Sequence, residues 1–231
     1  MSWRTNPIIL KMRGLGRFLG INKLIASYIL GEGYETRYED SFFSNLRLND
    51  CIWDVGANIG HYTKLFSKQV GDSGRVFSFE PSPINFVNLK ESSKLLKNTI
   101  LFNFGLGDKK EKLCFQQGAD DIGATSRIVD SDVGGVDVDI LVGLDLINEG
   151  IAIEPNAIKI DVEGFEYEVL RGLGNYLNNP KLRLIGVEIH FEILKDRGIE
   201  GAPVLIENML VASGFIVEWT DPSHIVATRN N

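Results

Sequence analysis

The sequence contains few cysteines and histidines, two and three respectively among 231 residues. Cys51 and Cys114 each lie in an apolar, strand-like pattern, so we expect two buried thiols and neither a disulfide nor a metal pair. No group of cysteines and histidines has the spacing of a zinc site. Two unpaired cysteines fit a protein that resides in a reducing compartment, and we expect a cytoplasmic protein.

Long apolar runs and an excess of basic charge are also missing from the sequence. No stretch reaches the roughly 18 apolar residues of a membrane-spanning helix, and Ile8-Ile9-Leu10 is too short for the apolar part of a signal peptide. The formal net charge is −7, which argues against a general nucleic-acid-binding surface, because such surfaces are basic. A chain of 231 residues fits one main globular domain.

The N-terminal segment differs in character from the rest of the chain. Residues 8–30 are apolar and basic, and glycines interrupt any single long helix there. We expect a helical extension over residues 1–33, followed by the main domain at 34–231. The extension is expected to pack on the domain, to cover the substrate as a lid, or to join two chains in a homodimer. Attachment to a membrane surface is the weaker alternative.

From residue 51 onward, strand-like patterns alternate with helical ones, which predicts βαβ units and a mostly parallel sheet. The last two strands are joined by Asp221-Pro222-Ser223 alone, a turn that permits an antiparallel pair and not a parallel one. We therefore predict an α/β fold with a seven-stranded sheet, one reversed strand and helices on both faces. The predicted strands are 51–55, 75–80, 99–105, 157–161, 183–190, 215–219 and 224–228, and the predicted helices are 59–70, 83–97, 163–177 and 203–213.

A long segment at 117–135 is rich in glycine, aspartate and serine and is predicted to form a loop. The flanking residues 112–116 and 136–142 are predicted as extra strands, because apolar residues alternate with polar ones in the second of them. Long loops in compact domains are usually functional or disordered. We expect this loop and the N-terminal segment to shape the site of the second substrate.

A glycine-rich turn, Asp54-Val55-Gly56-Ala57-Asn58-Ile59-Gly60, follows the first predicted strand. Such a turn brings backbone N–H groups close to a ligand at the positive end of a helix dipole. It departs from the dinucleotide fingerprint, because Asn58 replaces the second glycine and Asp54 places a negative charge where a pyrophosphate would approach. A ligand with a cationic centre, such as S-adenosylmethionine, fits better. An NAD-dependent oxidoreductase is therefore disfavoured.

An acidic residue, Glu80, ends the second predicted strand, and it follows Gly60 by 20 positions (80 − 60). A carboxylate at this place can accept hydrogen bonds from both hydroxyls of a ribose. A surface carboxylate before a proline turn is the alternative interpretation. The combination with Asp54 and the glycine-rich turn favours the ribose role.

Five segments, taken together, resemble the FkbM-type methyltransferases. The resemblance runs from about Tyr34 to about Gly214, and the order and spacing of the segments make it more specific than any one of them. It implies a class I, Rossmann-like methyltransferase that uses S-adenosylmethionine and most often acts on oxygen. The segments are DVGANIG (54–60), FSFEPSPINFVNLKES (77–92), FGLGD (104–108), KIDVEGFEYEVLRG (159–172) and VEIH (187–190). The chain departs from the family pattern at His61, where an aromatic or another polar residue is common, and over 115–133, which matches poorly.

Ligands of open α/β sheets bind beyond the carboxyl ends of the strands, and several motif residues are expected to meet at this edge. Asp161 is expected to touch the methionine part of the cofactor or the acceptor. The expected cofactor-binding residues are Asp54, Gly56, Ala57, Asn58, Gly60, Glu80, Pro81, Gly105 and Asp161.

Catalytic candidates follow the later strands of the predicted sheet. Strand alternation places Glu188 and His190 on the same side. Histidine has its ordinary pKa near neutrality, so we predict His190 as a general base, with Asp161 and Glu188 beside it; a hydrogen-bonded structural histidine is the alternative. The same side chains, with Glu163, could hold a divalent cation, but no spacing fixes one, and the sequence prediction is a site without metal.

Four residues are expected to contact the methyl acceptor: His61, Glu163, Ser126 and Arg127. Arg127 could pair with an anionic acceptor, and Glu163 could instead complement a helix dipole. The predicted reaction transfers a methyl group to a hydroxyl of a sugar or secondary metabolite. Ester formation on a carboxylate of a peptide or small molecule is the alternative. A non-catalytic binding module is disfavoured, because the motif residues are intact.

Overall fold

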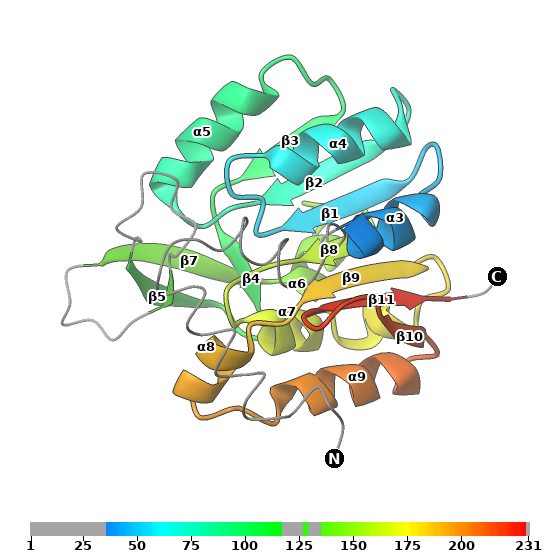
Figure 1. The fold of residues 1–231 in the computed structure, drawn as a ribbon. Coiled ribbons are helices and arrows are strands. Elements are labelled where there is room, and N and C mark those ends of the chain that lie inside the picture. Colours follow the sequence, from blue (N-terminus) through cyan, green and yellow to red (C-terminus); the bar gives the residue numbers. More distant parts are fainter. Residues whose placement is uncertain (1–35, 117–126, 129–134, 230–231) are drawn as a thin grey trace.

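The computed structural model describes residues 36–116, 127–128 and 135–229. Seven strands form the main sheet in the order β10-β11-β9-β8-β1-β2-β3, and Figure 1 shows them running as one twisted layer through the molecule. All neighbours pair in parallel except β11, which is antiparallel to both β9 and β10. The predicted fold class is confirmed. The strands are β1 (Cys51–Val55), β2 (Arg75–Phe79), β3 (Thr99–Phe102), β8 (Ala157–Ile160), β9 (Leu184–Glu188), β10 (Ile216–Trp219) and β11 (His224–Thr228).

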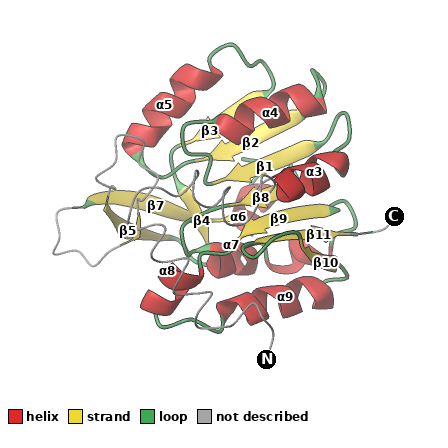
Figure 2. Cartoon of the chain, in the orientation of Figure 1, coloured by secondary structure: helices red, strands yellow, loops and turns green. Residues whose placement is uncertain are grey.

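Helices cover both faces of this sheet (Figure 2). One face carries α3 (Thr36–Ser44), α4 (His61–Val70) and α5 (Pro83–Ser93), and the other carries α6 (Gly143–Asn148), α7 (Glu166–Gly172) and α9 (Ala202–Ala212). The short helix α8 (Phe191–Asp196) follows β9, and a 3-10 turn at Gly174–Asn178 follows α7. None of the helices in the described ranges has the length and apolarity needed to cross a membrane.

Strand alternation divides the buried core into two layers, as β1 illustrates. Ile52 packs in the layer that contains Phe42 of α3 and Phe66 of α4, whereas Trp53 and Val55 pack in the layer that contains α6, α7 and α9. Side chains of neighbouring strand residues point to opposite faces, so a strand buried on both faces reads as a continuous apolar run. The run Cys51-Ile52-Trp53 has this character because its strand is central.

A second, smaller sheet packs beside the first in the order β4-β7-β5-β6. Two predictions for this part of the chain are wrong. The predicted strand 99–105 ends at Phe102, because the Asn103 amide turns back to donate to the carbonyls of Glu80 and Pro81 at 2.9 and 3.1 Å. Two residues of the predicted loop form β6 and pair with β5. The strands are β4 (Gly105–Gly107), β5 (Glu111–Gln116), β6 (Arg127–Ile128) and β7 (Val136–Val142).

The helix predicted from residue 163 begins only at Glu166. Glu163 and Gly164 have φ angles of 48° and 91°, which a right-handed helix excludes. The alternative interpretation of Glu163, a first-turn carboxylate that complements the helix dipole, is therefore wrong, and its predicted contact with the acceptor stays a prediction. The strand predicted over 183–190 likewise ends at Glu188, and His190 directly precedes α8.

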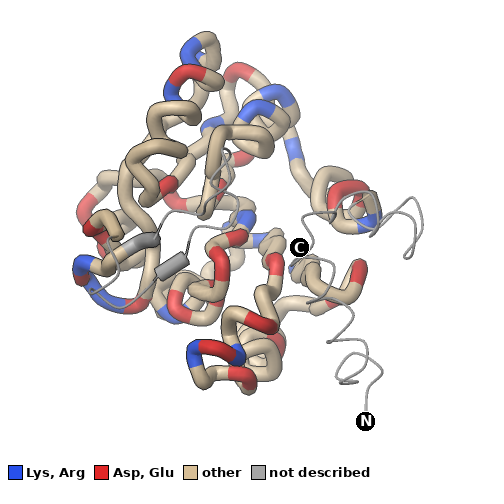
Figure 3. The backbone as a smooth tube through the Cα atoms, turned by 60° about the vertical axis from the view of Figure 1, so that its left-hand side comes forward, with Lys and Arg blue, Asp and Glu red and all other residues tan. Residues whose placement is uncertain are grey.

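Charged residues of both signs are interspersed along the described part of the chain, as Figure 3 shows. This distribution agrees with the net charge of −7.

We expect Gly172→Ala to destabilise the domain by about 1–3 kcal/mol or more, the cost of overpacking. A Cβ atom on Gly172 would lie 1.9 Å from the carbonyl oxygen of Gly107, so α7 could not keep its contact with β4. Urea unfolding would measure the loss. Gly201→Ala is the control, since its Cβ would meet nothing within 4 Å. Equal stabilities of the two variants would contradict this account of the packing.

Candidate active site at the carboxyl edge of the sheet

The glycine-rich turn after β1 is fixed against the ends of β2 and β8. The N–H groups of Gly56 and Ala57 both donate to the carbonyl of Phe79 at 3.0 Å. A Cβ on Gly56, whose φ is 79°, would lie 1.8 Å from the carbonyl oxygen of Asp161. Only glycine fits here, and its absent side chain lets the turn and the end of β8 meet. Asn58 has a φ of 50°, a conformation that asparagine tolerates.

Glu80 is buried directly after β2 and points back to this turn. Its Oε2 accepts from the N–H of Asn58 and its Oε1 from the N–H of Ser82, both at 2.8 Å. Each carboxylate oxygen has a second lone pair, so two further donors, such as vicinal hydroxyls, can still bind. Burial raises the pKa of Glu80 to about 7, although the two backbone hydrogen bonds lower it.

Two buried oxygens in the turn have no hydrogen-bond partner among the described residues: Oδ1 of Asp54 and Oδ1 of Asn58. The other oxygen of Asp54 accepts from Thr63 Oγ1 at 2.7 Å. Buried polar atoms are normally satisfied by protein, water or ligand. The turn and Glu80 therefore fit a polar ligand that carries hydrogen-bond donors.

Lys159 was not singled out from the sequence. It lies in β8, the neighbour of β1 in the sheet, and connects this strand to the glycine-rich turn. Its ammonium donates to the carbonyl of Gly56 at 3.1 Å and lies 3.5 Å from Asp54 Oδ1 and 3.3 Å from Asp161 Oδ2. Burial by itself lowers the pKa of Lys159, but Asp161 and Asp54 outweigh it and raise that pKa above its ordinary value. A lysine inside the otherwise apolar strand β8 (Ala157–Ile160) was the signal that could have identified it.

His190 lies at the centre of a group of carboxylates. Its Nδ1 is 2.6 Å from Oε1 of Glu166, a fully buried residue. Its Nε2 faces Glu163 Oε2 at 3.3 Å, Asp161 Oδ1 at 3.7 Å and Glu188 Oε1 at 3.9 Å. The structure thus brings the predicted catalytic residues together and adds Glu166, which the sequence analysis missed.

The charges around His190 affect its predicted role as a base. Burial by itself lowers the pKa of His190, but the hydrogen bond with Glu166 and the charges of Glu163 and Glu188 raise it to about 10. The imidazole then already holds a proton at neutral pH, which opposes the role of a general base. That role remains a prediction.

His224 extends this cluster on the far side of Glu188. Its Nε2 lies 3.4 Å from Glu188 Oε2, and its Nδ1 lies 2.9 Å from Asp221 Oδ1. Burial by itself lowers the pKa of His224, but Asp221 and Glu188 raise it to about 10. The carboxylate of Glu188 therefore lies between two buried histidines, His190 and His224, which hold it in position.

Of the other predicted site residues, some lie near the glycine-rich turn and others lie outside the described part of the chain. A Cβ on Gly105 would lie 3.6 Å from atoms of Pro81, so these two are neighbours. His61 is exposed at the first position of α4 and its ring packs on Tyr62. Arg127 is described only as part of β6. Ser126 and the segment 1–33 lie outside the described residues.

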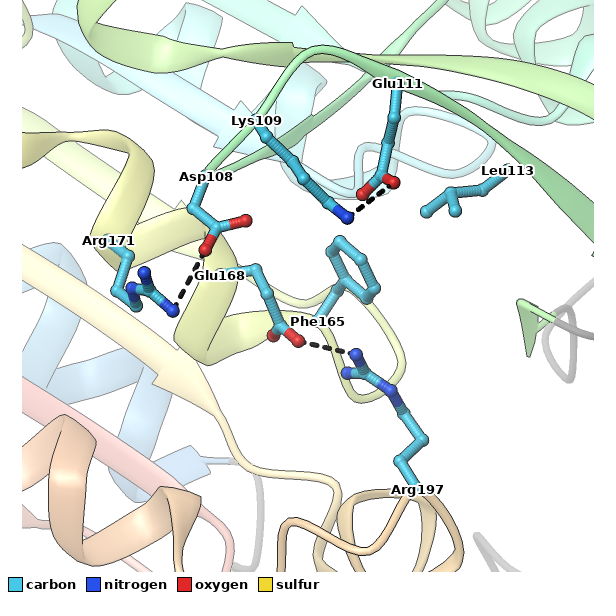
Figure 4. A pocket seen from close by; sticks show the side chains of 8 residues that line it. All are labelled: Asp108, Lys109, Glu111, Leu113, Phe165, Glu168, Arg171 and Arg197. Atoms are coloured by element: carbon cyan, nitrogen blue, oxygen red, sulfur yellow. Dashed lines mark hydrogen bonds and ion pairs between the residues drawn. The ribbon is translucent and has the colours of Figure 1, made fainter.

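A surface pocket of about 370 Å³ lies beside the loop that carries Glu163. Figure 4 shows that its charged side chains pair with one another. Arg197 binds Glu168 and the carbonyl of Gly164, and its guanidinium lies 4.5 Å from the centre of the Phe165 ring. Because its cations are already paired, this pocket supports the loop at 163–165 and does not form an anion site. The other ion pairs are Lys109–Glu111 and Arg171–Asp108.

The sheet order and the single reversed strand agree with the Rossmann-like fold of a class I methyltransferase. A model of the methyltransferase FkbM domain matches residues 54–217, and the chain belongs to this family. The predicted family and class of enzyme are confirmed. With them, S-adenosylmethionine is confirmed as the cofactor.

One curated relative and two solved structures illustrate the similarity. The hexuronic acid methyltransferase AglP of Haloferax volcanii is 33% identical over 143 residues, which cover 62% of this chain and 56% of that protein. The chain thus spans little more than half the length of this relative. A proposed rRNA methylase of Clostridium thermocellum has a TM-score of 0.52 at 13% identity, covering 86% of this chain and 97% of that one. A proposed methyltransferase of Streptococcus mutans, in complex with SAH, has a TM-score of 0.51 at 13% identity, covering 85% and 97%. The two structures show the fold alone.

Proposed function

We propose that the chain transfers a methyl group from S-adenosylmethionine to an oxygen of a sugar. The observation that carries this proposal is the cluster of His190, Asp161, Glu163 and Glu188 directly beside the glycine-rich turn. Carboxylates that are partly exposed accept hydrogen bonds from hydroxyl groups, and a sugar offers several. The name of the relative AglP, a hexuronic acid methyltransferase, supports a sugar acceptor.

In this proposal, Glu80 holds the two ribose hydroxyls, and Gly56, Ala57, Asn58 and Asp54 surround the rest of the cofactor. The free lone pairs of Glu80 and the unsatisfied oxygen of Asn58 support the assignment. Pro81 directly follows Glu80 and neighbours Gly105, and in this proposal the two residues line the adenine. Gly60 gives the turn the left-handed conformation that leads into α4.

S-adenosylmethionine supplies, when bound, a methyl group on a cationic sulfur, so that an acceptor oxygen can form the new bond while the carbon–sulfur electron pair stays on sulfur. The chain has to align the acceptor with this methyl, and alignment alone supplies about 7–11 kcal/mol. A hydroxyl must also lose its proton, for which His190, Asp161 and Glu188 are the candidate acceptors. Asp161 adjoins Gly56 and so connects the two halves of the site.

Methyl-ester formation is the second candidate function, because a hexuronic acid carries a carboxylate as well as hydroxyls, and AglP is named for that substrate. A carboxylate acceptor needs no base. It would, however, have to approach Asp161, Glu163 and Glu188, which repel it unless a cation intervenes.

The test uses methyl-labelled S-adenosylmethionine with uronic acid glycosides and with the matching neutral hexosides. We expect label on the sugar, and mild alkali separates the two candidates, since an ester releases methanol and an ether does not. Label on both sugar series that resists alkali supports the hydroxyl. Label only on uronic acids that alkali removes supports the ester. Cofactor binding without label on any sugar would contradict the sugar acceptor.

Binding of S-adenosylmethionine is expected to weaken as the pH falls below about 7, by up to about tenfold per pH unit. The ribose hydroxyls donate to the ionised carboxylate of Glu80, so binding lowers the pKa of about 7 that burial gives this group. Below pH 7 binding should therefore release a proton, and above about pH 8 it should release none. The stability of the free protein depends on pH in the opposite direction. Because the pKa of Glu80 is raised in the folded protein, its protonation stabilises the fold at low pH, and this contribution to the free energy of unfolding is lost as the pH rises through 7.

Calorimetry at pH 6 and pH 8.5, in buffers with different ionisation enthalpies, measures this proton release. Glu80→Gln is the matched control and should remove the pH dependence. If proton release is the same at both pH values, Glu80 does not bind the ribose as a carboxylate.

A further inference from the structure

We propose that Asp161, Glu163 and His190 form a binding site for a divalent cation of the Mn²⁺ type. One oxygen of each carboxylate and one ring nitrogen lie within 4.8 Å of one another. Divalent cations bind such ligands at about 2.1–2.5 Å, so ligand atoms on opposite sides of the ion are about 4.2–5.0 Å apart. The three atoms are thus spaced as ligands of one ion.

The buried imidazole distinguishes this site from an ordinary cluster of acidic side chains. His190 is 3% exposed, and Glu166 binds its Nδ1 at 2.6 Å. A histidine that binds a metal through one ring nitrogen usually donates the other N–H to a carboxylate, which fixes the ring and its tautomer. Here this arrangement turns Nε2 toward Asp161 and Glu163.

Glu166 is itself held in place, as a positioning residue must be. It is fully buried, and its Oε1 also accepts from the N–H of Gly164 at 2.9 Å. Glu163 precedes that glycine in the same left-handed turn. One carboxylate therefore positions both the imidazole and the loop that carries a second ligand.

The two carboxylates are partly exposed, whereas the imidazole is buried. The side chains of Asp161 and Glu163 are 29% and 33% exposed, against 3% for His190. Three protein ligands, two of them partly exposed, fit a metal site that also binds a substrate. The combination of carboxylates with one imidazole favours Mn²⁺ over Mg²⁺, which prefers oxygen and water.

The role of the ion rests on the proposed function. An ion bound by Asp161 would lie next to the glycine-rich turn, because the backbone of Asp161 contacts Gly56. There it would bind oxygens of the acceptor, offset the repulsion between the carboxylates and an anionic sugar, and ease the loss of a hydroxyl proton. It would serve the hydroxyl and the carboxylate acceptor alike.

Titration of the protein with MnCl₂, followed by the electron paramagnetic resonance of free Mn²⁺, tests the site directly. The wild type is expected to bind one Mn²⁺ per chain. Glu163→Gln is expected to weaken binding at least about tenfold, the lower end of what altered metal sites lose. Glu149→Gln, an exposed carboxylate at the end of α6, is the matched control and should bind like the wild type.

Asp161→Asn is the second variant if Glu163→Gln does not fold, as judged by its melting temperature. Absence of Mn²⁺ binding to the wild type at millimolar concentration, or equal binding by Glu163→Gln, would overturn the proposal. Calorimetry with SAH, the demethylated product of the cofactor, on the same samples tests the proposed metal site and the proposed function separately. SAH binding without Mn²⁺ binding refutes the metal site alone, whereas Mn²⁺ binding without methyl transfer to any sugar supports the site and refutes the proposed acceptor.

Discussion

Calorimetry on a Glu80→Ala variant is expected to show S-adenosylmethionine binding weakened by about 100-fold or more. Hydrogen bonds to a charged group contribute about 1.5–3 kcal/mol each, and two ribose hydroxyls would lose their acceptor together. A loss of about 2.7 kcal/mol is already 100-fold. The variant also leaves the N–H groups of Asn58 and Ser82 without the oxygens that hold them, so the turn itself should loosen.

Glu91→Ala is the control for this experiment, because Glu91 is an exposed glutamate whose only described ion pair is with Lys94. It should bind the cofactor like the wild type. Glu80→Gln should fall between the two, since its amide keeps one acceptor oxygen. Tight NAD binding by the wild type, with no response to S-adenosylmethionine, would contradict the assignment of the site.

Much of the fold could be predicted because the main sheet is buried on both faces. Runs such as Cys51-Ile52-Trp53 are apolar without alternation, and this run is followed by the ten-residue helix α4. The turn at Asp221-Pro222-Ser223 fixed the direction of the last strand by its length alone. These are local signals, and neither requires knowledge of distant contacts.

The end of β3 and the start of α7 could not be predicted in the same way. Glu163 and Gly164 adopt left-handed conformations, and Gly164 lies where a Cβ would be 2.5 Å from a side-chain atom of Ile193 in α8. The sequence shows a good helix former at 163, but contacts from a distant helix decide the backbone there. Asn103 ends β3 through bonds to carbonyls more than twenty residues away.

The candidate site was found only in part, and His224 shows why. A reversed strand begins at the edge where its parallel neighbours end, and His224 is paired in register with Glu188. The predicted reversal therefore already implied that its first residue lies at the site. Glu166 was missed for another reason: a glutamate in the first turn of a helix usually faces solvent, and only the structure shows that this one is fully buried.

Replacing His190 with alanine is expected to lower kcat by about 10²–10⁴-fold, with SAH affinity nearly unchanged. This residue reaches Asp161, Glu163 and Glu188 at the acceptor side, whereas the proposed cofactor contacts lie at the turn and at Glu80. The variant leaves Glu166 buried without the ring that it binds, so its melting temperature must be measured as well. Glu166→Gln keeps the ring and should lose about 10–100-fold, as expected for a positioning residue.

A chelator decides how His190 acts. If the imidazole is a metal ligand, removal of the ion from the wild type should cost about the same factor in kcat as His190→Ala, and the chelator should then have no further effect on the variant. Two changes that remove one and the same interaction do not add. If the imidazole is the base itself, the wild type should be insensitive to the chelator while the variant still loses turnover. Near-normal turnover of a folded His190→Ala protein, with or without chelator, would exclude both roles and leave Asp161 or a carboxylate acceptor as the explanation.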